Sequence, residues 1–138
     1  MPAIRRQIMV TAPPRQVWAA LTTGEGLAQW LVDEARVDGR KGGRVVLINQ
    51  DDEGNPIEDR GIVHTWRPTS HFEINFDSVG KGPLKGTRLS FSVAMDEGET
   101  RVALVHSGAL FDDADENARV DKEWRQAMKA LQAMLDGD

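Results

Sequence analysis

The stretch from Asp115 to Leu135 constrains the fold of this chain more than any other part of it. Apolar residues recur there at intervals of three and four, and charged or amide side chains fill the positions between them. This spacing predicts one long amphipathic helix with a broad apolar stripe. The stripe consists of Val120, Trp124, Ala127, Met128, Leu131, Met134 and Leu135. A stripe of this width needs a large apolar surface opposite it, which the rest of the chain must supply.

Most of the preceding chain has the alternation of β-strands. Phe72, Ile74 and Phe76, for example, alternate with polar residues, so this segment should present one apolar face to the core. In the segment 57–67 the apolar and polar sets are mixed, which suggests a bulge near Gly61 and leaves the facing of its side chains open. The expected strands are 4–11, 35–37, 44–49, 57–67, 71–77, 87–95 and 100–107.

Two short helices are expected between the first two strands. Pro14 suits the first turn of a helix, because its missing N–H would be unpaired there anyway. Thr22-Thr23-Gly24 should end that helix, and Leu27, Trp30 and Leu31 indicate a second one. The resulting order is β-α-α-β-β-β-β-β-β-α within a single domain over residues 1–138. Helices segregated from a mostly antiparallel sheet define an α+β fold.

Composition excludes several functional classes. The chain has no cysteine, so disulfides, thiol nucleophiles and thiolate metal sites are absent. A net charge of −5 and a pI of about 5.2 argue against nucleic-acid partners and anionic membrane surfaces. Three separated histidines, with the acidic clusters in turns, do not form a metal site, and no cofactor is expected. No stretch has the length of a signal peptide or a membrane span, so we expect no membrane insertion and a cytoplasmic location.

One ordered set of short motifs spans nearly the whole chain: Ala12-Pro13-Pro14, Val17-Trp18, Leu21, Leu27, Trp30-Leu31, Gly42-Gly43, Gly61-Ile62-Val63, Pro68, Thr100-Arg101-Val102, His106-Ser107-Gly108, Trp124, Leu131 and Leu135. This set resembles the START-like, helix-grip superfamily, in particular the branch related to the C-terminal domain of the Hsp90 ATPase activator. One position departs from that pattern, since Glu123 precedes Trp124 where these proteins often carry glycine.

The resemblance implies a curved antiparallel sheet that wraps a long C-terminal helix, often with a cavity between them. It therefore implies binding of a small hydrophobic molecule, such as a lipid, an aromatic compound or a polyketide-like compound. The alternative is that the same large side chains simply fill the core. The candidate lining residues are Trp30, Trp66, Phe72, Phe76, Phe91, His106, Trp124, Met128 and Leu131.

His106 is the most informative polar residue in the sequence. It is in phase with Val102 and Leu104, so it should point inward near the end of the last strand. A buried neutral imidazole hydrogen-bonded to backbone is one interpretation, and an anchor for a ligand or a general acid or base is the other. The segment 80–86 lacks the order of a phosphate-binding loop, and we expect a flexible hairpin loop that acts as a lid on the cavity.

The resemblance leaves two further functions open. One is an interaction module for a chaperone such as Hsp90. The other is an enzyme similar to polyketide cyclases, in which Asp33, Glu34 and Arg36 would assist aldol or dehydration chemistry at the cavity mouth. No catalytic set of serine, histidine and acid, and no acid pair, is readable in the sequence, so ligand binding without catalysis is favoured.

Overall fold

The computed structural model describes residues 3–79 and 82–136. It contains one antiparallel sheet of seven strands in the spatial order β1-β7-β6-β5-β4-β3-β2. The strands are β1 (Ala3–Val10), β2 (Glu34–Val37), β3 (Arg44–Gln50), β4 (Pro56–Arg67), β5 (His71–Phe76), β6 (Arg88–Asp96) and β7 (Glu99–Ser107). The helices are α1 (Pro14–Thr22), α2 (Gly24–Leu27), the short 3-10 turn η1 (Ala109–Asp112) and α3 (Ala114–Leu135). The α+β class and the helix-grip arrangement are confirmed.

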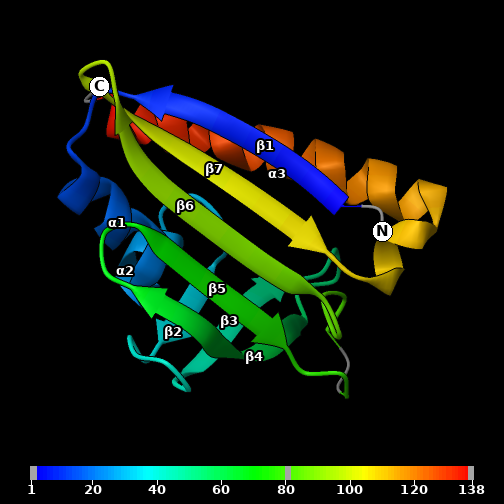
Figure 1. Ribbon diagram of the computed structural model, residues 1–138. Helices are drawn as coiled ribbons and strands as arrows, with labels where there is room; N and C mark the ends of the chain where they lie inside the picture. Colours follow the sequence, from blue (N-terminus) through cyan, green and yellow to red (C-terminus); the bar gives the residue numbers. More distant parts are fainter. Residues whose placement is uncertain (1–2, 80–81, 137–138) are drawn as a thin grey trace.

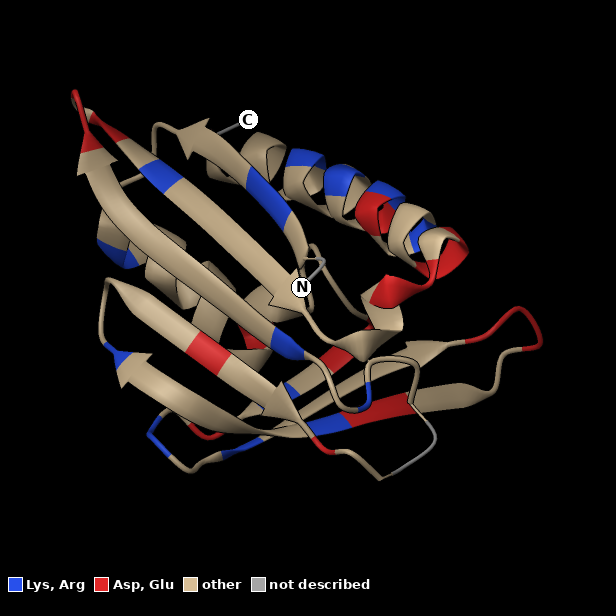
Figure 2. Ribbon diagram, turned by 45° about the vertical axis from the view of Figure 1, so that its right-hand side comes forward, with Lys and Arg blue, Asp and Glu red and all other residues tan. Residues whose placement is uncertain are grey.

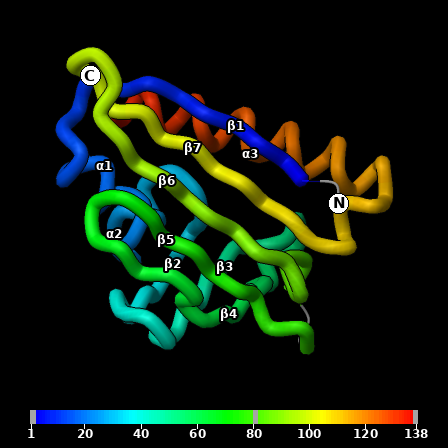
Figure 3. The backbone as a smooth tube through the Cα atoms, viewed as in Figure 1, coloured from blue at the N-terminus to red at the C-terminus, as the bar shows by residue number. Residues whose placement is uncertain are grey.

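The three α-helices lie on one side of the curved sheet (Figure 1). Helix α3 runs alongside β1, whereas α1 packs near β6 and β7, on the side of the C-terminal end of α3 (Figure 3). The first strand of the chain and the last helix therefore lie side by side. Within the described ranges, no helix is long and apolar enough to cross a membrane.

Helix α3 begins where the acidic residues of the sequence can cap it. The Asp113 carboxylate accepts hydrogen bonds from the backbone N–H groups of Asp115 (2.9 Å) and Glu116 (3.1 Å). Five residues of its apolar stripe are buried, namely Val120, Trp124, Met128, Leu131 and Leu135, and charged positions alternate with them along the helix (Figure 2). Arg6 of β1 donates two hydrogen bonds to Asp121, at 2.9 and 2.8 Å. This bidentate pair ties the first strand to the last helix.

Two local expectations need correction. The register shift in β4 lies between Val63 and Thr65, not at Gly61. Gly61 instead permits close strand packing, since a Cβ there would lie 2.6 Å from the Asn75 carbonyl oxygen. Helix α2 ends at Leu27, so Trp30 and Leu31 follow it in a turn. That turn folds back on the Leu27 carbonyl, which accepts from the N–H groups of Trp30, Leu31 and Val32.

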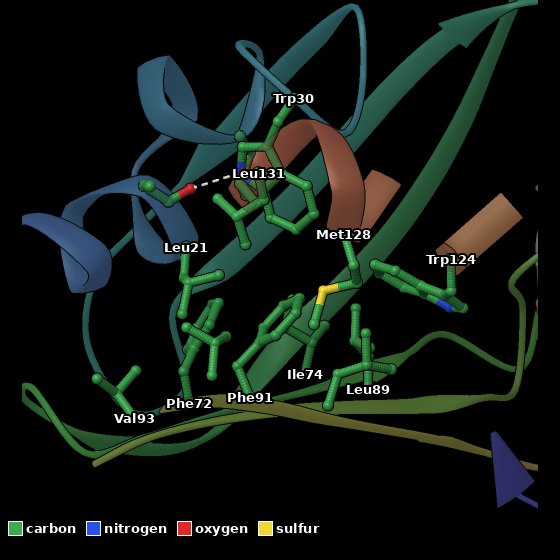
Figure 4. Close-up of a cluster of buried hydrophobic side chains, with 14 of the residues drawn as sticks. Leu21, Trp30, Phe72, Ile74, Leu89, Phe91, Val93, Trp124, Met128 and Leu131 are labelled. Carbon is green, nitrogen blue, oxygen red and sulfur yellow. Dashed lines mark hydrogen bonds between the residues drawn. The ribbon is translucent and has the colours of Figure 1, made fainter. Parts of the chain in front are cut away.

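The core is densely filled beside the C-terminal half of α3 (Figure 4). The ring of Trp30 lies 6.1 Å from Phe91 and 6.5 Å from Trp124, and those two rings lie 6.0 Å apart. The buried Trp30 indole donates to the Ala20 carbonyl at 2.9 Å, which fixes the ring against α1. Side chains therefore fill the space between helix and sheet at this end of the molecule.

Candidate ligand-binding pocket

A pocket of about 460 Å³ lies beside the N-terminal half of α3, where the dense core ends. Its walls come from the turn after α2, from β3 and β4, from the segment before β6, and from α3 itself. Most of the lining side chains are apolar, as is usual for small-molecule sites. The lining residues are Leu31, Val32, Asp33, Leu47, Asn49, Gln50, Asp59, Pro83, Leu84, Leu89, His106, Val120, Glu123, Trp124 and Ala127.

The strand register explains the floor of the pocket. Leu47 of β3 pairs with Asp59 of β4, and Leu89 of β6 pairs with His106 of β7. Directly opposed residues share one face of a sheet, so all four side chains point toward the helices. Helix α3 supplies the other wall from Val120, Glu123, Trp124 and Ala127, whose spacing puts them on one helical face.

His106 is the centre of a buried hydrogen-bond chain. Trp124 Nε1 donates to His106 Nδ1 at 3.0 Å, and His106 Nε2 lies 2.9 Å from Thr87 Oγ1. The Thr87 hydroxyl in turn donates to the Leu84 carbonyl at 2.6 Å. This order of donors requires the Nε2–H tautomer of a neutral imidazole. The chain links α3, β7 and the segment at Leu84, which forms part of the pocket wall.

The inward position of His106 is confirmed, because the residue is fully buried. Burial lowers the pKa of His106 from 6.5 to about 4, since a charged imidazolium would lack water there. Its partners are the side chains of Trp124 and Thr87, which corrects the interpretation of an imidazole bonded to backbone groups. With both ring nitrogens engaged, His106 positions the wall of the pocket, and acid or base chemistry would require breaking this chain.

Asp59 is the buried polar residue of the pocket that the sequence did not reveal. Its carboxylate is buried, with 8% of the residue exposed, and Oδ1 accepts from the Leu84 N–H at 2.8 Å. Burial raises the pKa of Asp59, and the hydrogen bond from Leu84 opposes that shift. The sequence left the facing of 57–67 open. Asp59, Gly61 and Val63 are spaced two residues apart, so their side chains share one face of β4. Had Val63 been assigned to the buried face, Asp59 would have been assigned to it as well.

Asp59 also borders a second hollow of about 620 Å³, whose lining contains more charged residues. That hollow lies near the turn that joins β3 and β4, where Glu58, Arg60, Asp77 and Lys85 contribute charged side chains. It contains none of the aromatic residues that the sequence singled out. Asp59 is thus the one described residue that these two lining sets share.

Two of the candidate lining residues, His106 and Trp124, line the 460 Å³ pocket. Trp66 and Phe72 instead pack with Trp18 at the α1 end of the sheet, with ring centroids 5.3 to 6.3 Å apart. Met128 borders a separate hollow between β1 and α3. The other candidates, Trp30, Phe76, Phe91 and Leu131, are buried in the core. That any of these side chains contacts a ligand stays a prediction.

Of the three charged residues expected at the cavity mouth, Asp33 lines the pocket and Glu34 and Arg36 do not. The Asp33 carboxylate accepts from the Gln50 N–H at 3.1 Å. Glu34 and Arg36 are exposed and form a pair with each other at 3.8 Å. No group of three potential metal-ligating side chains comes together in residues 3–79 and 82–136.

The segment that was expected to act as a lid lies partly outside the described residues, since Gly80 and Lys81 are not described. Its remaining part packs tightly onto β4. A Cβ on Gly82 would lie 2.1 Å from Asp59 Oδ1 and 2.4 Å from the Glu58 carbonyl oxygen. Pro83 and Leu84 follow directly and contribute to the pocket wall.

Replacing Gly82 by alanine is therefore expected to push this segment away from β4. We expect a loss of roughly 1–3 kcal/mol in the free energy of unfolding, as for other overpacked sites. Urea unfolding of the variant measures this loss, with Ala114→Gly as a control for an alanine–glycine exchange at an exposed position. An unchanged stability would contradict the tight packing of Gly82.

Comparison with solved structures shows where this fold recurs. The solution structure of the Aha1 dimer from Colwellia psychrerythraea is 24% identical, with a TM-score of 0.80, over 99% of this chain and 98% of that one. A crystal structure of a protein from Mesorhizobium loti is 18% identical, with a TM-score of 0.81, over 99% of both chains. DynU16, a protein in the dynemicin biosynthetic locus, is 19% identical, with a TM-score of 0.80, over 98% of this chain and 47% of its own. At these identities the likeness shows the fold.

The sequence itself identifies the family. No curated protein sequence matches the chain significantly. The family described as "Activator of Hsp90 ATPase homolog 1-like protein" matches residues 11–136, from the end of β1 to the end of α3. This range contains both walls of the pocket and the buried chain of Trp124, His106 and Thr87. The protein therefore belongs to the activator of Hsp90 ATPase homolog 1-like family, within the helix-grip superfamily.

Proposed function

We propose that this protein binds a small hydrophobic molecule in the pocket between the sheet and the N-terminal half of α3. The observation that carries the proposal is the pocket itself, about 460 Å³ in volume and lined mainly by aliphatic side chains and Trp124. This volume falls within the usual range for small-molecule sites, about 300–1,000 Å³. Burial of apolar ligand surface would supply most of the binding free energy.

The buried hydrogen-bond chain supports a preformed site. Trp124 and Leu84 stand on opposite walls, and His106 and Thr87 connect them through side-chain hydrogen bonds. A wall that is already fixed loses little conformational freedom when a ligand enters, which favours affinity. Binding without catalysis fits this arrangement, because neither nitrogen of His106 is free to transfer a proton.

An NMR titration with small aromatic, acyl and sterol-like compounds tests the proposal. The Trp124 indole N–H should shift saturably, because its ring lines the pocket. The indole of Trp18 lies at the far end of the sheet, packed on Trp66, and should not move. If no compound moves Trp124, or if Trp18 and Trp124 shift together in proportion to compound concentration, the proposal fails.

Blocking the pocket gives a second test. Ala127 lines it and is half-buried, so Ala127→Phe should fill part of the pocket and weaken ligand binding at least about tenfold. Ala118→Phe is the matched control, since Ala118 is exposed on α3 and does not line the pocket. Titration calorimetry with any compound from the panel measures both. Equal affinities of the two variants would place the ligand elsewhere.

The family description supports a second candidate function, association with an Hsp90-type chaperone. The exposed large apolar residues of the described chain are Ile62, Val79 and Met95, 41%, 84% and 56% exposed, and they lie on three separate segments. A chaperone activator should raise the ATPase rate of a purified Hsp90 protein. Ile62→Ser in the outer face of β4 should then reduce the stimulation. No stimulation at micromolar concentrations removes this candidate and leaves the ligand-binding proposal untouched.

A further inference from the structure

We infer that the pocket selects hydrophobic ligands that carry a protonated amine, and that the buried carboxylate of Asp59 is the group that recognises the amine. This inference rests on the proposed function and names the chemical class of its ligand. It predicts the order amine, then neutral alcohol, then carboxylic acid for compounds that share one apolar skeleton.

The first supporting observation is the sign of the charges around the pocket. The lining contains three carboxylates, those of Asp33, Asp59 and Glu123, and no lysine or arginine among the described residues. The other polar groups of the lining are the amides of Asn49 and Gln50 and the engaged imidazole of His106. A carboxylic acid would meet only like charge here, which makes its transfer from water unfavourable.

The second observation is how differently the three carboxylates are engaged. Glu123 is paired with Arg119 at 2.9 Å, so its charge is largely compensated. Asp33 is exposed and accepts from the Gln50 N–H, so water screens its charge. Asp59 is buried, and no described ion pair includes it. Asp59 is therefore the group whose environment would gain most from a cation.

The third observation is the geometry at Asp59. Its Oδ1 accepts from the Leu84 N–H at 2.8 Å, and Oδ2 has no hydrogen-bond partner among the described residues. The residue is largely buried, which raises the pKa of its carboxyl group, but Oδ2 is not fully enclosed and therefore borders solvent-accessible space. An ammonium group in the pocket would restore both a charge partner and a second hydrogen bond. The aliphatic walls around Leu47 and Leu89 would hold the apolar part of the same molecule.

The test uses three compounds with one skeleton, 2-naphthylmethylamine, 2-naphthylmethanol and 2-naphthoate. Binding is measured by calorimetry at pH 8, where the free amine is protonated and the free carboxylic acid is ionised. We expect the amine to bind at least about tenfold more tightly than the acid, as for hydrogen bonds to charged groups. The alcohol should fall between them. An acid that binds as tightly as the amine overturns the inference while the proposed function stands.

If none of the three compounds binds, the inference is overturned as well. The broad NMR panel then decides separately whether the pocket binds any other ligand, so the two failures are distinguishable.

Asp59→Asn isolates the carboxylate. Asparagine has nearly the same size, and its Oδ1 still accepts from the Leu84 N–H. The variant should bind the amine about tenfold more weakly than the wild type does. Its affinity for the alcohol should stay within about twofold of the wild-type value, and its affinity for the acid should rise. Asp77→Asn is the matched control, because Asp77 borders the neighbouring hollow but not this pocket. An amine affinity that falls equally in both variants would indicate a general charge effect and overturn the assignment to Asp59.

Thermal unfolding checks that both variants fold. Should Asp59→Asn not fold, the ranking of the three compounds on the wild-type protein still decides the inference.

Discussion

Replacing Phe91 by alanine is expected to lower the free energy of unfolding by roughly 3–5 kcal/mol and to leave the ranking of ligands unchanged. Phe91 is almost fully buried, and its ring contacts Trp30 and Trp124 in the dense part of the core. Removal of the ring leaves a cavity that these large neighbours cannot collapse to fill. Urea unfolding measures the loss, and a titration of the folded variant measures binding.

Leu84→Ala is the informative counterpart to this variant. Leu84 is half-buried and lines the pocket, so its truncation should cost less stability but weaken ligand binding. The two variants together separate the filled core from the pocket. If Phe91→Ala altered ligand affinity more than Leu84→Ala, the ligand would lie deeper between sheet and helix than the pocket described here.

The fold was predictable because its two dominant patterns are periodic. The stripe from Val120 to Leu135 fixed the buried face of α3, and the alternation in β5, β6 and β7 fixed which face of the sheet packs on it. His106 could be placed inside for the same reason, since it continues the inward set of β7. These are local properties of the chain, and local properties can be read from a sequence.

The pocket was less predictable because it depends on non-local geometry. The aromatic residues Trp30, Phe72 and Phe91 look equally suited to lining a cavity or filling a core, and the curvature of the sheet decides between these outcomes. In β4 the register shift after Val63 mixes the two sets of side chains, which concealed Asp59. The hydrogen-bond partners of His106 come from α3 and from the segment before β6, and no spacing in the sequence brings these together with β7.

Stability is expected to fall as the pH decreases from 7 to 4.5, and His106 should account for much of the fall. The unfolded chain protonates this imidazole near pH 6.5, whereas the folded protein resists protonation down to a pKa of about 4. The stability that the neutral imidazole contributes is therefore complete above pH 6.5 and is lost progressively between 6.5 and 4. The difference of about 2.5 pH units corresponds to roughly 3 kcal/mol, a loss that is complete only below the folded-state pKa of about 4.

Other titrating groups differ from His106 in the direction of their effect on stability or in the pH range where they act. The pKa of Asp59 is raised, so acidification relieves its burial and acts in the opposite direction. The pKa of Asp121 is lowered by its hydrogen bonds with Arg6, so its contribution is lost below about 3.8, outside the range measured. Both groups are present in the wild type and in a His106 variant, so their effects cancel in the comparison.

His106→Gln is the variant that isolates the imidazole, because glutamine is neutral at every pH and offers both an acceptor and a donor. At pH 7.5 it should be less stable than the wild type, because the substitution weakens the hydrogen bonds with Trp124 and Thr87. Its deficit should shrink as the pH falls toward 4.5, by up to about 1.4 kcal/mol per pH unit below 6.5. His71→Gln is the control, since it removes an imidazole that contacts Ser92 on the opposite face of the sheet. A constant deficit from pH 7.5 to 4.5 would mean that His106 protonates equally in the folded and unfolded chain, contrary to its enclosure between Trp124 and Thr87.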